Sequence, residues 1–575
     1  MPSVFINGAI GDVGPRTNTL QHDGFPAGVG NSVHAVNEVG YRAATDALWT
    51  WQSIKDFIEP DLDIIVDEMT LPYRPLLELE REKLIMANEN IVLIMSDQHH
   101  KRAMSSAGHP IVKTPAMDKL ASRGLSFSNA HCNFPLCGPS RAAFMTGRHP
   151  HENGVLTNDA EIPCDMPTFA HSFHVAGYET VLSGRMHFVG LDQRHGFEKR
   201  LIGDCPESSF IAAGWQLKQV LGDLVDTPGM SLTGLKKSGP GNSGYLDYDK
   251  EVTKATLNYL EERQQTKNDQ PFLLVAGYAM PHCPFVCEPD DFYQYYDQVP
   301  LRDSSEESLG EQHPFYQELR KRWGSNPLPD AEIMRRVETA YYGMVNHMDR
   351  QVGAIMDAID NSDYADNTTI IYTSDHGEQL GEHGMWWKST FMEGSIGVPL
   401  LVFTPDKKRA GATSKANVSL MDIGPTLLDL VGIEATPGAT AESFRCVLDD
   451  DESQWPDEVF AENCFPGYFS SPQRMYKKGP WKYSYFHDMP AQLFNIDDDP
   501  NEENNLANDS VQADRIKEMN ARVLENWDPH AQAETIKLRS EELRLIGQSQ
   551  KLAMPPEPDP IWFETVPENY IEDIK

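Results

Sequence analysis

Ile91-Val92-Leu93-Ile94-Met95-Ser96-Asp97-Gln98-His99 is the stretch that decides the fold class. Its first five residues are apolar and three of them are β-branched, which is typical of a strand buried on both faces of a parallel sheet. Asp97 and Gln98 come directly after this strand. Open α/β sheets bind their ligands at the carboxyl ends of the strands. The stretch therefore predicts a central strand of an α/β fold with a binding site at its end.

Three further segments repeat this arrangement of a strand followed by polar side chains. Residues 178–183, 272–277 and 369–373 are expected strands, and helices are expected over 249–263 and 331–359. The polar side chains that follow these strands are Arg185, His187, His282, Asp375 and His376. Because parallel strands end at the same edge of a sheet, we expect these side chains to meet in one site.

The segment Cys137-Gly138-Pro139-Ser140-Arg141-Ala142-Ala143-Phe144-Met145-Thr146-Gly147-Arg148 is the strongest chemical signal in the chain. Pro139 lacks an N–H and has a fixed φ, which suits the first turn of a helix. Cys137 is therefore expected at the N-terminus of a helix, where free N–H groups and the helix dipole favour negative charge. Arg141 lies one helical turn further on and can reach the same place. A nucleophile beside an arginine at a helix N-terminus suits a tetrahedral oxyanion substrate.

This segment closely resembles the sulfatase signature Cys-x-Pro-Ser-Arg-x-x-x-x-Thr-Gly-Arg. In that family a maturation enzyme oxidises the cysteine to formylglycine, and the hydrated aldehyde attacks the sulfur of a sulfate ester. The resemblance covers roughly residues 89 to 510. It implies an α/β fold of the alkaline phosphatase superfamily, with a large, mixed, mostly parallel sheet sandwiched by helices and a smaller C-terminal α+β subdomain. The segment 192–198 is most similar to choline-sulfatase-like members. The implied partners are a small sulfated substrate and the formylglycine-generating enzyme.

The resemblance also implies a metal site. In sulfatases, residues at matching strand ends bind a divalent cation together with the formylglycine. The implied ligands are Asp97, Gln98, Asp375, His376 and the formylglycine at Cys137. The oxygen ligands favour Ca²⁺, and the histidine permits Mn²⁺ as the alternative.

The same family places cationic and polar side chains around the sulfate. The implied catalytic residues are Cys137, Arg141, His187, His282 and Lys388, and the implied substrate-binding residues are Asn158 and Arg185. His282 would protonate the leaving oxygen as general acid, and the cationic and amide side chains would hold the negative charge of the transition state. Two positions depart from the family pattern. The chain has Arg185 where the family usually has a lysine, and Gly397 where many relatives have an arginine.

Two alternative functions stay open at this point. The same machinery would hydrolyse a phosphonate monoester or a phosphodiester, because the leaving group and the geometry of attack are alike. Sulfate is favoured, since Gly184-Arg185-Met186-His187 follows sulfatases more closely than phosphonate hydrolases. In the other alternative, Cys137 stays a thiol and the chain is a non-catalytic anion-binding protein. The sequence does not identify the alcohol half of the ester.

The length of 575 residues indicates more than one domain. We expect a catalytic domain over 86–406 and a C-terminal subdomain with a tail over 407–575. Residues 1–85 are expected to be an accessory or relict segment, because they contain a motif that resembles a neutral ceramidase-type one whose nucleophilic serine falls at Gly14. Residues 199–245, rich in Gly, Ser and Pro, are expected to form loops at the substrate entrance.

Composition limits the partners and the compartment. The formal net charge of −37 argues against a nucleic-acid partner and against an anionic membrane surface. The eight cysteines have no regular disulfide or zinc-binding spacing, so we expect free thiols in a reducing compartment. The chain contains no apolar run of the length that spans a membrane and no recognisable secretory signal. A soluble, cytoplasmic protein is therefore expected, and assembly into a homo-oligomer stays open.

Overall fold

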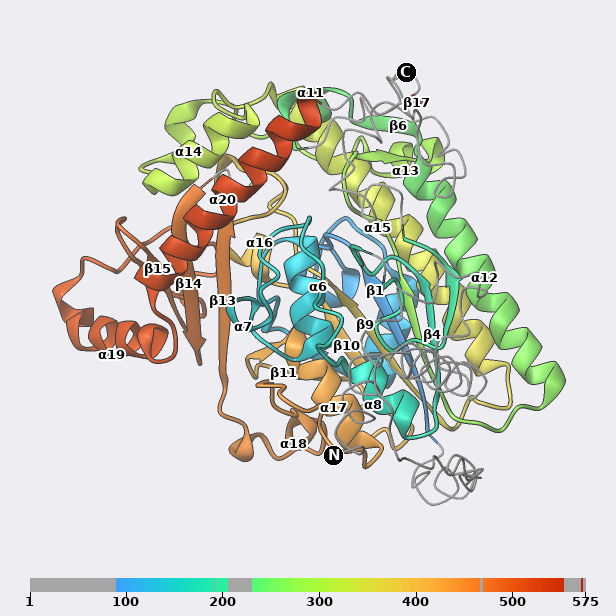
Figure 1. The fold of residues 1–575 in the computed structure, drawn as a ribbon. Helices are drawn as coiled ribbons and strands as arrows, with labels where there is room; N and C mark the ends of the chain where they lie inside the picture. The colour runs from blue at the N-terminus through green and yellow to red at the C-terminus, as the bar shows by residue number, and fades with distance from the viewer. Residues whose placement is uncertain (1–88, 191, 205–229, 466–468, 553–569, 572–575) are drawn as a thin grey trace, which may run out of the picture. The chain divides into compact units, whose positions relative to one another are not determined.

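A computed structural model describes residues 89–190, 192–204, 230–465, 469–552 and 570–571. In this part of the chain, eight strands form one sheet in the order β11-β2-β10-β9-β1-β7-β4-β5, with β1 near its middle (Figure 1). The strands are β1 (Asn90–Ser96), β2 (Leu125–Phe127), β4 (Glu179–Gly184), β5 (Lys199–Ile202), β7 (Phe272–Gly277), β9 (Thr368–Ser374), β10 (Leu400–Phe403) and β11 (Ala412–Ser414). Strands β9, β1, β7, β4 and β5 run parallel, whereas β10 is antiparallel to both of its neighbours. The predicted mixed, mostly parallel sheet is confirmed.

Strand β1 forms because its side chains are buried on both faces of the sheet. Ile91 and Leu93 join one hydrophobic core, and Val92 and Ile94 join the other. This alternation follows from the pleat, which sends successive side chains to opposite faces. Each such aliphatic side chain stabilises the fold by about 1.5–3 kcal/mol relative to an exposed one. The apolar run at 91–95 therefore fixes the strand at the centre of the protein.

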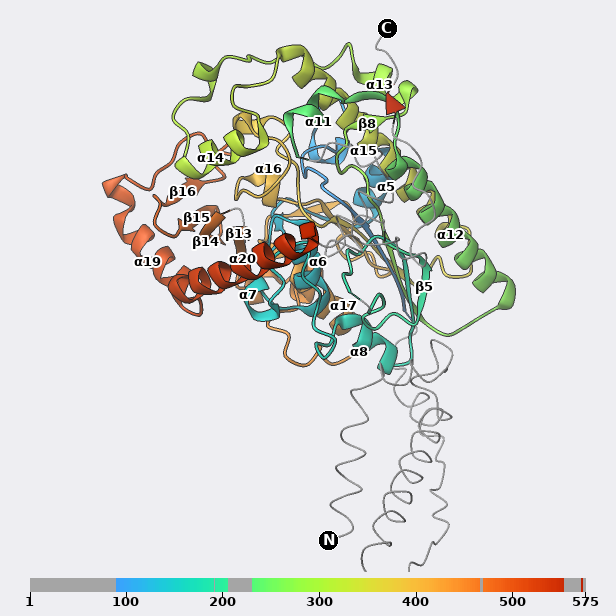
Figure 2. The same ribbon diagram turned by 45° about the horizontal axis from the view of Figure 1, so that its top comes forward.

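Helices cover both faces of the large sheet. On one face α15 packs against both α5 and α12, which contact the strands, and on the other face α6, α8 and α17 form a second layer (Figure 2). These helices are α5 (Pro115–Arg123), α6 (Cys137–Thr146), α8 (Phe169–Val175), α12 (Gly244–Thr266), α15 (Ala331–Asp360) and α17 (Ile423–Leu430). The helices predicted over 249–263 and 331–359 are confirmed as α12 and α15.

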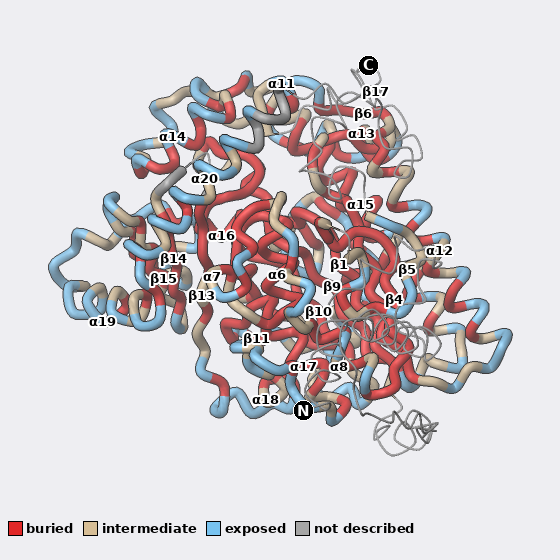
Figure 3. The backbone as a smooth tube through the Cα atoms, viewed as in Figure 1, coloured by how far each residue is buried: buried red, intermediate tan, exposed pale blue. Residues whose placement is uncertain are grey.

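A smaller antiparallel sheet follows the large one in the chain. Its strands β13 (Glu458–Phe465), β14 (Phe469–Lys478), β15 (Trp481–Phe486) and β16 (Gln492–Asn495) pair in sequence order. Helix α19 (Ala513–Leu524) packs on β14 and β15 over a separate hydrophobic core. Buried residues concentrate in the large sheet and around α6, whereas the outer surfaces of α12 and α19 are exposed (Figure 3). The predicted C-terminal α+β subdomain is confirmed, but β11 belongs to the large sheet, which therefore extends past the expected boundary at 406.

Further helices and strands accompany these layers. They are β3 (Ala130–His131), α7 (Pro150–Asn153), α11 (Leu232–Lys236), β6 (Gly239–Asn242), β8 (Val286–Cys287), α13 (Pro289–Tyr295), α14 (Pro314–Trp323), α16 (Glu393–Ile396), β12 (Val418–Ser419), α18 (Arg445–Leu448), α20 (Pro529–Leu552) and β17 (Tyr570–Ile571). The expectation of loops over 199–245 is wrong for β5, α11 and β6. Strand β5 pairs with β4 at the sheet edge, where a short, charged strand gives little apolar signal in the sequence.

Several expectations concern the chain as a whole. The accessory segment predicted over 1–85 and residues 205–229 lie outside the described residues. Within the described ranges, the cysteines are free thiols, as expected. No helix in that same part of the chain is both long and apolar enough to cross a membrane.

Candidate active site

The register of the central strands brings the two predicted acidic ligands together. Strands β1 and β9 pair with Ser96 opposite Ser374, so the residues that follow them, Asp97 and Asp375, leave the sheet side by side. Strands β7 and β4 are parallel to this pair and end at the same edge. The predicted site therefore lies at the carboxyl edge of the sheet.

A glycine at the end of β7 permits a close approach of the neighbouring loop. A Cβ atom added at Gly277 would lie 1.8 Å from the backbone oxygen of Arg185. The backbone N–H of Arg185 in turn donates to the Gly277 carbonyl oxygen at 2.8 Å. This contact holds the loop that carries Arg185 and His187 against the edge of the sheet.

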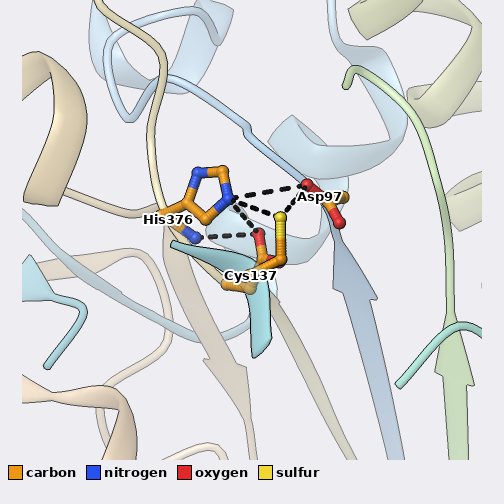
Figure 4. A group of neighbouring side chains, drawn as sticks. Asp97, Cys137 and His376 are labelled. Carbon is orange, nitrogen blue, oxygen red and sulfur yellow. Dashed lines mark hydrogen bonds and ion pairs between the residues drawn. The ribbon is translucent and has the colours of Figure 1, made fainter. Parts of the chain in front are cut away.

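Four buried side chains form the centre of the site. The donor atoms of Asp97, Cys137, Asp375 and His376 all lie within 4.8 Å of one another. Cys137 Sγ is 3.1 Å from His376 Nε2 and 3.6 Å from Asp97 Oδ1, and Figure 4 shows the sulfur between the carboxylate and the imidazole. His376 Nδ1 is 2.9 Å from the Gly377 carbonyl oxygen, so it carries the ring proton and leaves the Nε2 lone pair for the cluster. Two carboxylates and an imidazole are a donor set for a divalent cation.

Gln98 is turned so that its amide oxygen is free. Gln98 Nε2 donates to Glu378 Oε2 at 2.5 Å, while Gln98 Oε1 is buried and has no partner in the described part of the chain. Glu378 Oε1 accepts from the N–H groups of Leu380 at 2.8 Å and Trp387 at 2.6 Å, so this carboxylate is an acceptor throughout. The backbone N–H of Gln98 donates to Asp375 Oδ1 at 3.1 Å. A buried oxygen without a donor costs free energy that a bound cation would offset, so the residues present fit a metal ion.

Helix α6 begins at Cys137, as predicted. The next backbone N–H, that of Gly138, donates to Asn158 Oδ1 at 2.9 Å. Lys388 Nζ lies 2.9 Å from Cys137 Sγ. Burial raises the pKa of the Cys137 thiol, but the charge of Lys388 and the neighbouring imidazoles outweigh burial and lower this pKa well below its ordinary value. The position of Cys137 therefore favours negative charge on the nucleophile.

Both predicted arginines bind the carboxylates of the cluster. Arg141 Nε donates to Asp375 Oδ2 at 2.8 Å, and its Nη2 donates to Asp97 Oδ2 at 3.2 Å. Arg185 Nε donates to the same Asp97 oxygen at 2.7 Å. Burial and the charge at Cys137 raise the pKa of Asp97, but Arg185 and Arg141 hold it well below its usual range. The arginines therefore orient both carboxylates and keep Asp97 in its ionised form, which the sequence motif alone did not indicate.

Lys388 joins the nucleophile to His282. Lys388 Nζ is 2.9 Å from His282 Nε2, the same distance as from Cys137 Sγ. His282 Nδ1 lies 2.5 Å from the carbonyl oxygen of Cys283 and therefore carries the ring proton. Burial lowers the pKa of Lys388, but the charges of Cys137 and Asp97 raise it above its ordinary value. The lysine thus supplies a proton that lies between His282 and the nucleophile.

His187 completes the set of predicted residues. Its Nε2 is 3.3 Å from the backbone oxygen of Asn158, and its Nδ1 is 3.4 Å from Arg185 Nη2. The structure thus brings all of the predicted site residues into one buried region. The catalytic and ligand roles of the individual residues remain predictions.

The sequence analysis missed three carboxylates that surround this region. Glu378 orients Gln98. The signal in the sequence that could have found it is its position two residues after His376, at the end of β9. Asp249 accepts from the backbone N–H groups of Ala279 at 2.8 Å and Met280 at 2.9 Å, which fixes the loop between β7 and His282. Asp204 holds the loop after β4. Asp249 and Asp204 lie far along the chain from the groups they bind, and no local pattern marks them.

The glycine at position 397 has a structural explanation. A Cβ atom there would come 2.5 Å from Lys101 Cδ, so the lysine side chain fills the space that an arginine at 397 would need. Lys101 pairs with the fully buried carboxylate of Glu393. Lys101, from another segment of the chain, therefore supplies a positive charge next to Gly397, where many relatives have an arginine.

Comparison with known proteins identifies the family. A sequence model of the sulfatase family matches residues 89–433, and a model for the C-terminal part of N-sulphoglucosamine sulphohydrolase matches residues 381–528. The chain belongs to the sulfatase family. A curated relative, the choline-sulfatase of Rhizobium meliloti, is 33% identical over 430 residues, which are 73% of this chain and 82% of the relative. This sulfatase is thus a hydrolase of sulfuric esters, as the signature implied.

Solved structures with the same fold include sulfatases and related hydrolases. A phosphonate monoester hydrolase of Agrobacterium radiobacter has a TM-score of 0.64 at 24% identity, covering 77% of this chain and 96% of its own. A structure solved in complex with D-glucosamine-2-N,6-O-disulfate has a TM-score of 0.61 at 22% identity, covering 78% and 99%. Because these sequence identities are below 25%, the likeness shows only that this sulfatase shares their fold. The family assignment rests on the sequence comparisons, so the phosphonate hydrolase structures do not change it.

Proposed function

We propose that this sulfatase hydrolyses the sulfate ester of a small alcohol with a formylglycine made from Cys137 as nucleophile. The observation that carries the proposal is the position of Cys137 Sγ, at a helix N-terminus and 2.9 Å from Lys388 Nζ, inside a cluster of buried acidic ligands. The unbroken signature from Cys137 to Arg148 is the feature that a maturation enzyme would recognise. The alternative, a non-catalytic anion-binding protein with an unmodified Cys137 thiol, does not explain why the thiol lies inside this cluster.

The proposed reaction has two steps on residue 137. The aldehyde adds water, so that one carbon carries two hydroxyl groups. One hydroxyl releases its proton as its oxygen forms a bond to sulfur and the bond from sulfur to the alcohol oxygen breaks, and the alcohol leaves with the proton shared by His282 and Lys388. The second hydroxyl then loses its proton, the carbon–oxygen bond to the sulfate breaks, and the aldehyde reforms as sulfate leaves.

A divalent cation would be held by Asp97, Gln98, Asp375 and His376 together with residue 137, and when bound it would neutralise sulfate charge and lower the pKa of the attacking hydroxyl. We favour Ca²⁺ because carboxylate and amide oxygens dominate the donor set, with Mn²⁺ as the alternative because of the imidazole.

The remaining predicted residues divide into two roles. Lys388, His187 and Asn158 are proposed to hold the negative charge of the transition state, with Arg185 bridging between the sulfate and Asp97. Arg141 is proposed to position Asp97 and Asp375, because its guanidinium donates to both carboxylates. The substrate-binding set is thus more basic than the chain as a whole, which suits an anionic substrate in a protein of net charge −37.

Exhaustive chelation should lower kcat/KM for an aryl sulfate by about tenfold or more, because the two acidic ligands then repel the sulfate. Adding back Ca²⁺ should restore the activity better than Mn²⁺. The measurement is a metal titration of the chelated protein with turnover and metal content followed together. Full activity in a sample shown to contain no divalent metal would contradict the proposed cation.

Sulfate esters should be hydrolysed faster than phosphonate monoesters with the same aryl leaving group. We expect kcat/KM to differ by about tenfold or more in favour of sulfate, which is within the range that contacts to a reacting group can supply. Both substrates are assayed on one preparation, with Cys137→Ala as the control for contaminating hydrolases. A preference for the phosphonate would make the related-family activity the better proposal.

A further inference from the structure

The loop that carries His187 has an unusual backbone. His187 has a φ of +61°, in the left-handed region that non-glycine residues rarely adopt. A residue in this conformation turns the N–H groups on either side of it toward one point, which makes a small anion-binding hollow in the backbone. The N–H groups concerned are those of Met186 and Phe188. What fills the hollow therefore decides whether the loop keeps this shape.

Asp204 fills the hollow. Its Oδ2 accepts from the N–H of Met186 at 3.0 Å and from the N–H of Phe188 at 3.2 Å. The Asp204 side chain is fully buried, and Arg200 Nη2 donates to the same oxygen at 3.2 Å. Burial raises the pKa of Asp204, but the charges of Arg200, Arg185 and His187 lower it below its ordinary value. The hollow thus contains a carboxylate supplied by the chain itself.

The carbonyl groups of the same loop are held from the other side. Gln193 Nε2 donates to the carbonyl oxygens of Phe188 at 2.8 Å and Gly190 at 2.9 Å. Arg200 Nη1 donates to both the backbone and the side-chain oxygen of Gln193 at 2.7 Å. Arg200 therefore links Asp204, which accepts from the loop's N–H groups, to Gln193, which donates to its C=O groups. None of these side chains contributes a donor atom to the cluster around Cys137.

We propose that Asp204, braced by Arg200 and Gln193, is a positioning residue that holds His187 in its left-handed conformation and so aims the imidazole at the reacting sulfate. The inference rests on the proposed function, because it assigns His187 to the transition state. Without the carboxylate, the two N–H groups lose their acceptor and the strained backbone relaxes toward an ordinary conformation. A small displacement of a group that contacts the transition state costs much activity even when the fold is intact.

The test is a double-mutant cycle between Asp204 and His187 on the full chain carrying metal and formylglycine. Asp204→Ala should lower kcat/KM for an aryl sulfate by about tenfold to a hundredfold. Asp204→Asn keeps an acceptor oxygen and should recover most of this loss. In a His187→Ala background, Asp204→Ala should cost less than about twofold, because its effect passes through His187. Glu198→Ala removes a nearby, half-exposed carboxylate and should leave kcat/KM unchanged.

Two results would overturn the positioning role. One is wild-type kcat/KM in Asp204→Ala, and the other is an equal loss from Asp204→Ala with and without His187. If the alanine variant does not fold, Gln193→Leu removes the clamp on the carbonyl groups and is put through the same cycle with the same expected non-additivity. A wild-type protein that hydrolyses no sulfate ester would instead refute the proposed function, so the two failures are distinguishable.

Discussion

Replacing Cys137 by alanine should abolish sulfate-ester hydrolysis, with a loss in kcat on the order of 10⁴ or more, because removal of a covalent nucleophile leaves only binding and electrostatic stabilisation. The fold should survive, since the side chain is small and its loss leaves Lys388 and His376 facing space that water can enter. The variant should therefore show a wild-type circular dichroism spectrum and a melting temperature within a few degrees of wild type.

The companion measurement is peptide mass spectrometry of the wild-type protein from a host with the maturation enzyme. The peptide that contains residue 137 should carry an aldehyde in place of the thiol. Cys132→Ala is the matched control, because Cys132 is also fully buried and lies five residues earlier in the same connection to α6. It should keep both the aldehyde and the activity. An active protein whose Cys137 is a thiol throughout would refute the mechanism.

The parts of the fold that local patterns determine could be predicted from the sequence. The apolar run at 91–95 is short and rich in β-branched residues, as is typical of a strand covered on both faces, and it lies near the middle of the sheet. The same holds for 272–277, where the predicted bounds and β7 coincide. Pro139 placed Cys137 at a helix N-terminus for a reason that involves only a few neighbouring residues. These predictions succeeded because strand burial and helix initiation depend on residues close together in the chain.

The predictions that failed depend on partners far along the chain. Strand β5 is short and charged, and it exists because β4 offers it hydrogen bonds. The signature placed Arg141 near the nucleophile but could not show that its guanidinium is occupied by two carboxylates. Asp204 is marked by no motif, since its partners are backbone N–H groups of a loop that precedes it. Such long-range pairings follow from the assembled fold and leave no periodic trace in the sequence.

Exchanging the charges of Gln98 and Glu378 should show that this pair fixes the charge of the metal site. Gln98→Glu alone would set two buried carboxylates against each other where the two side chains are now 2.5 Å apart. Both positions are fully buried, so the free energy of unfolding should fall by about 3–5 kcal/mol, as for other uncompensated buried charges. Glu378→Gln alone should also destabilise the protein, because an amide nitrogen would then face a donor on Gln98 or on the backbone of Leu380 and Trp387.

The double variant Gln98→Glu/Glu378→Gln should recover most of the lost stability. The hydrogen bond reforms with its direction reversed, because the introduced amide at 378 donates to the introduced carboxylate at 98, and the other amide atom still accepts from Leu380 and Trp387. Thermal unfolding of the four proteins gives the coupling energy between the two sites, which should be about 2–3 kcal/mol, the upper part of the range for residues in contact.

The same double variant should bind a divalent cation more tightly than wild type, since the free oxygen at position 98 then carries charge. Isothermal titration of the chelated proteins with Ca²⁺ measures this affinity without relying on turnover. The added carboxylate also neutralises part of the cation's charge, so the cation stabilises the sulfate less. We therefore expect kcat to fall even as the metal affinity rises. If the double variant is as unstable as Gln98→Glu alone, Glu378 does not orient the amide, and the free oxygen of Gln98 has some other cause.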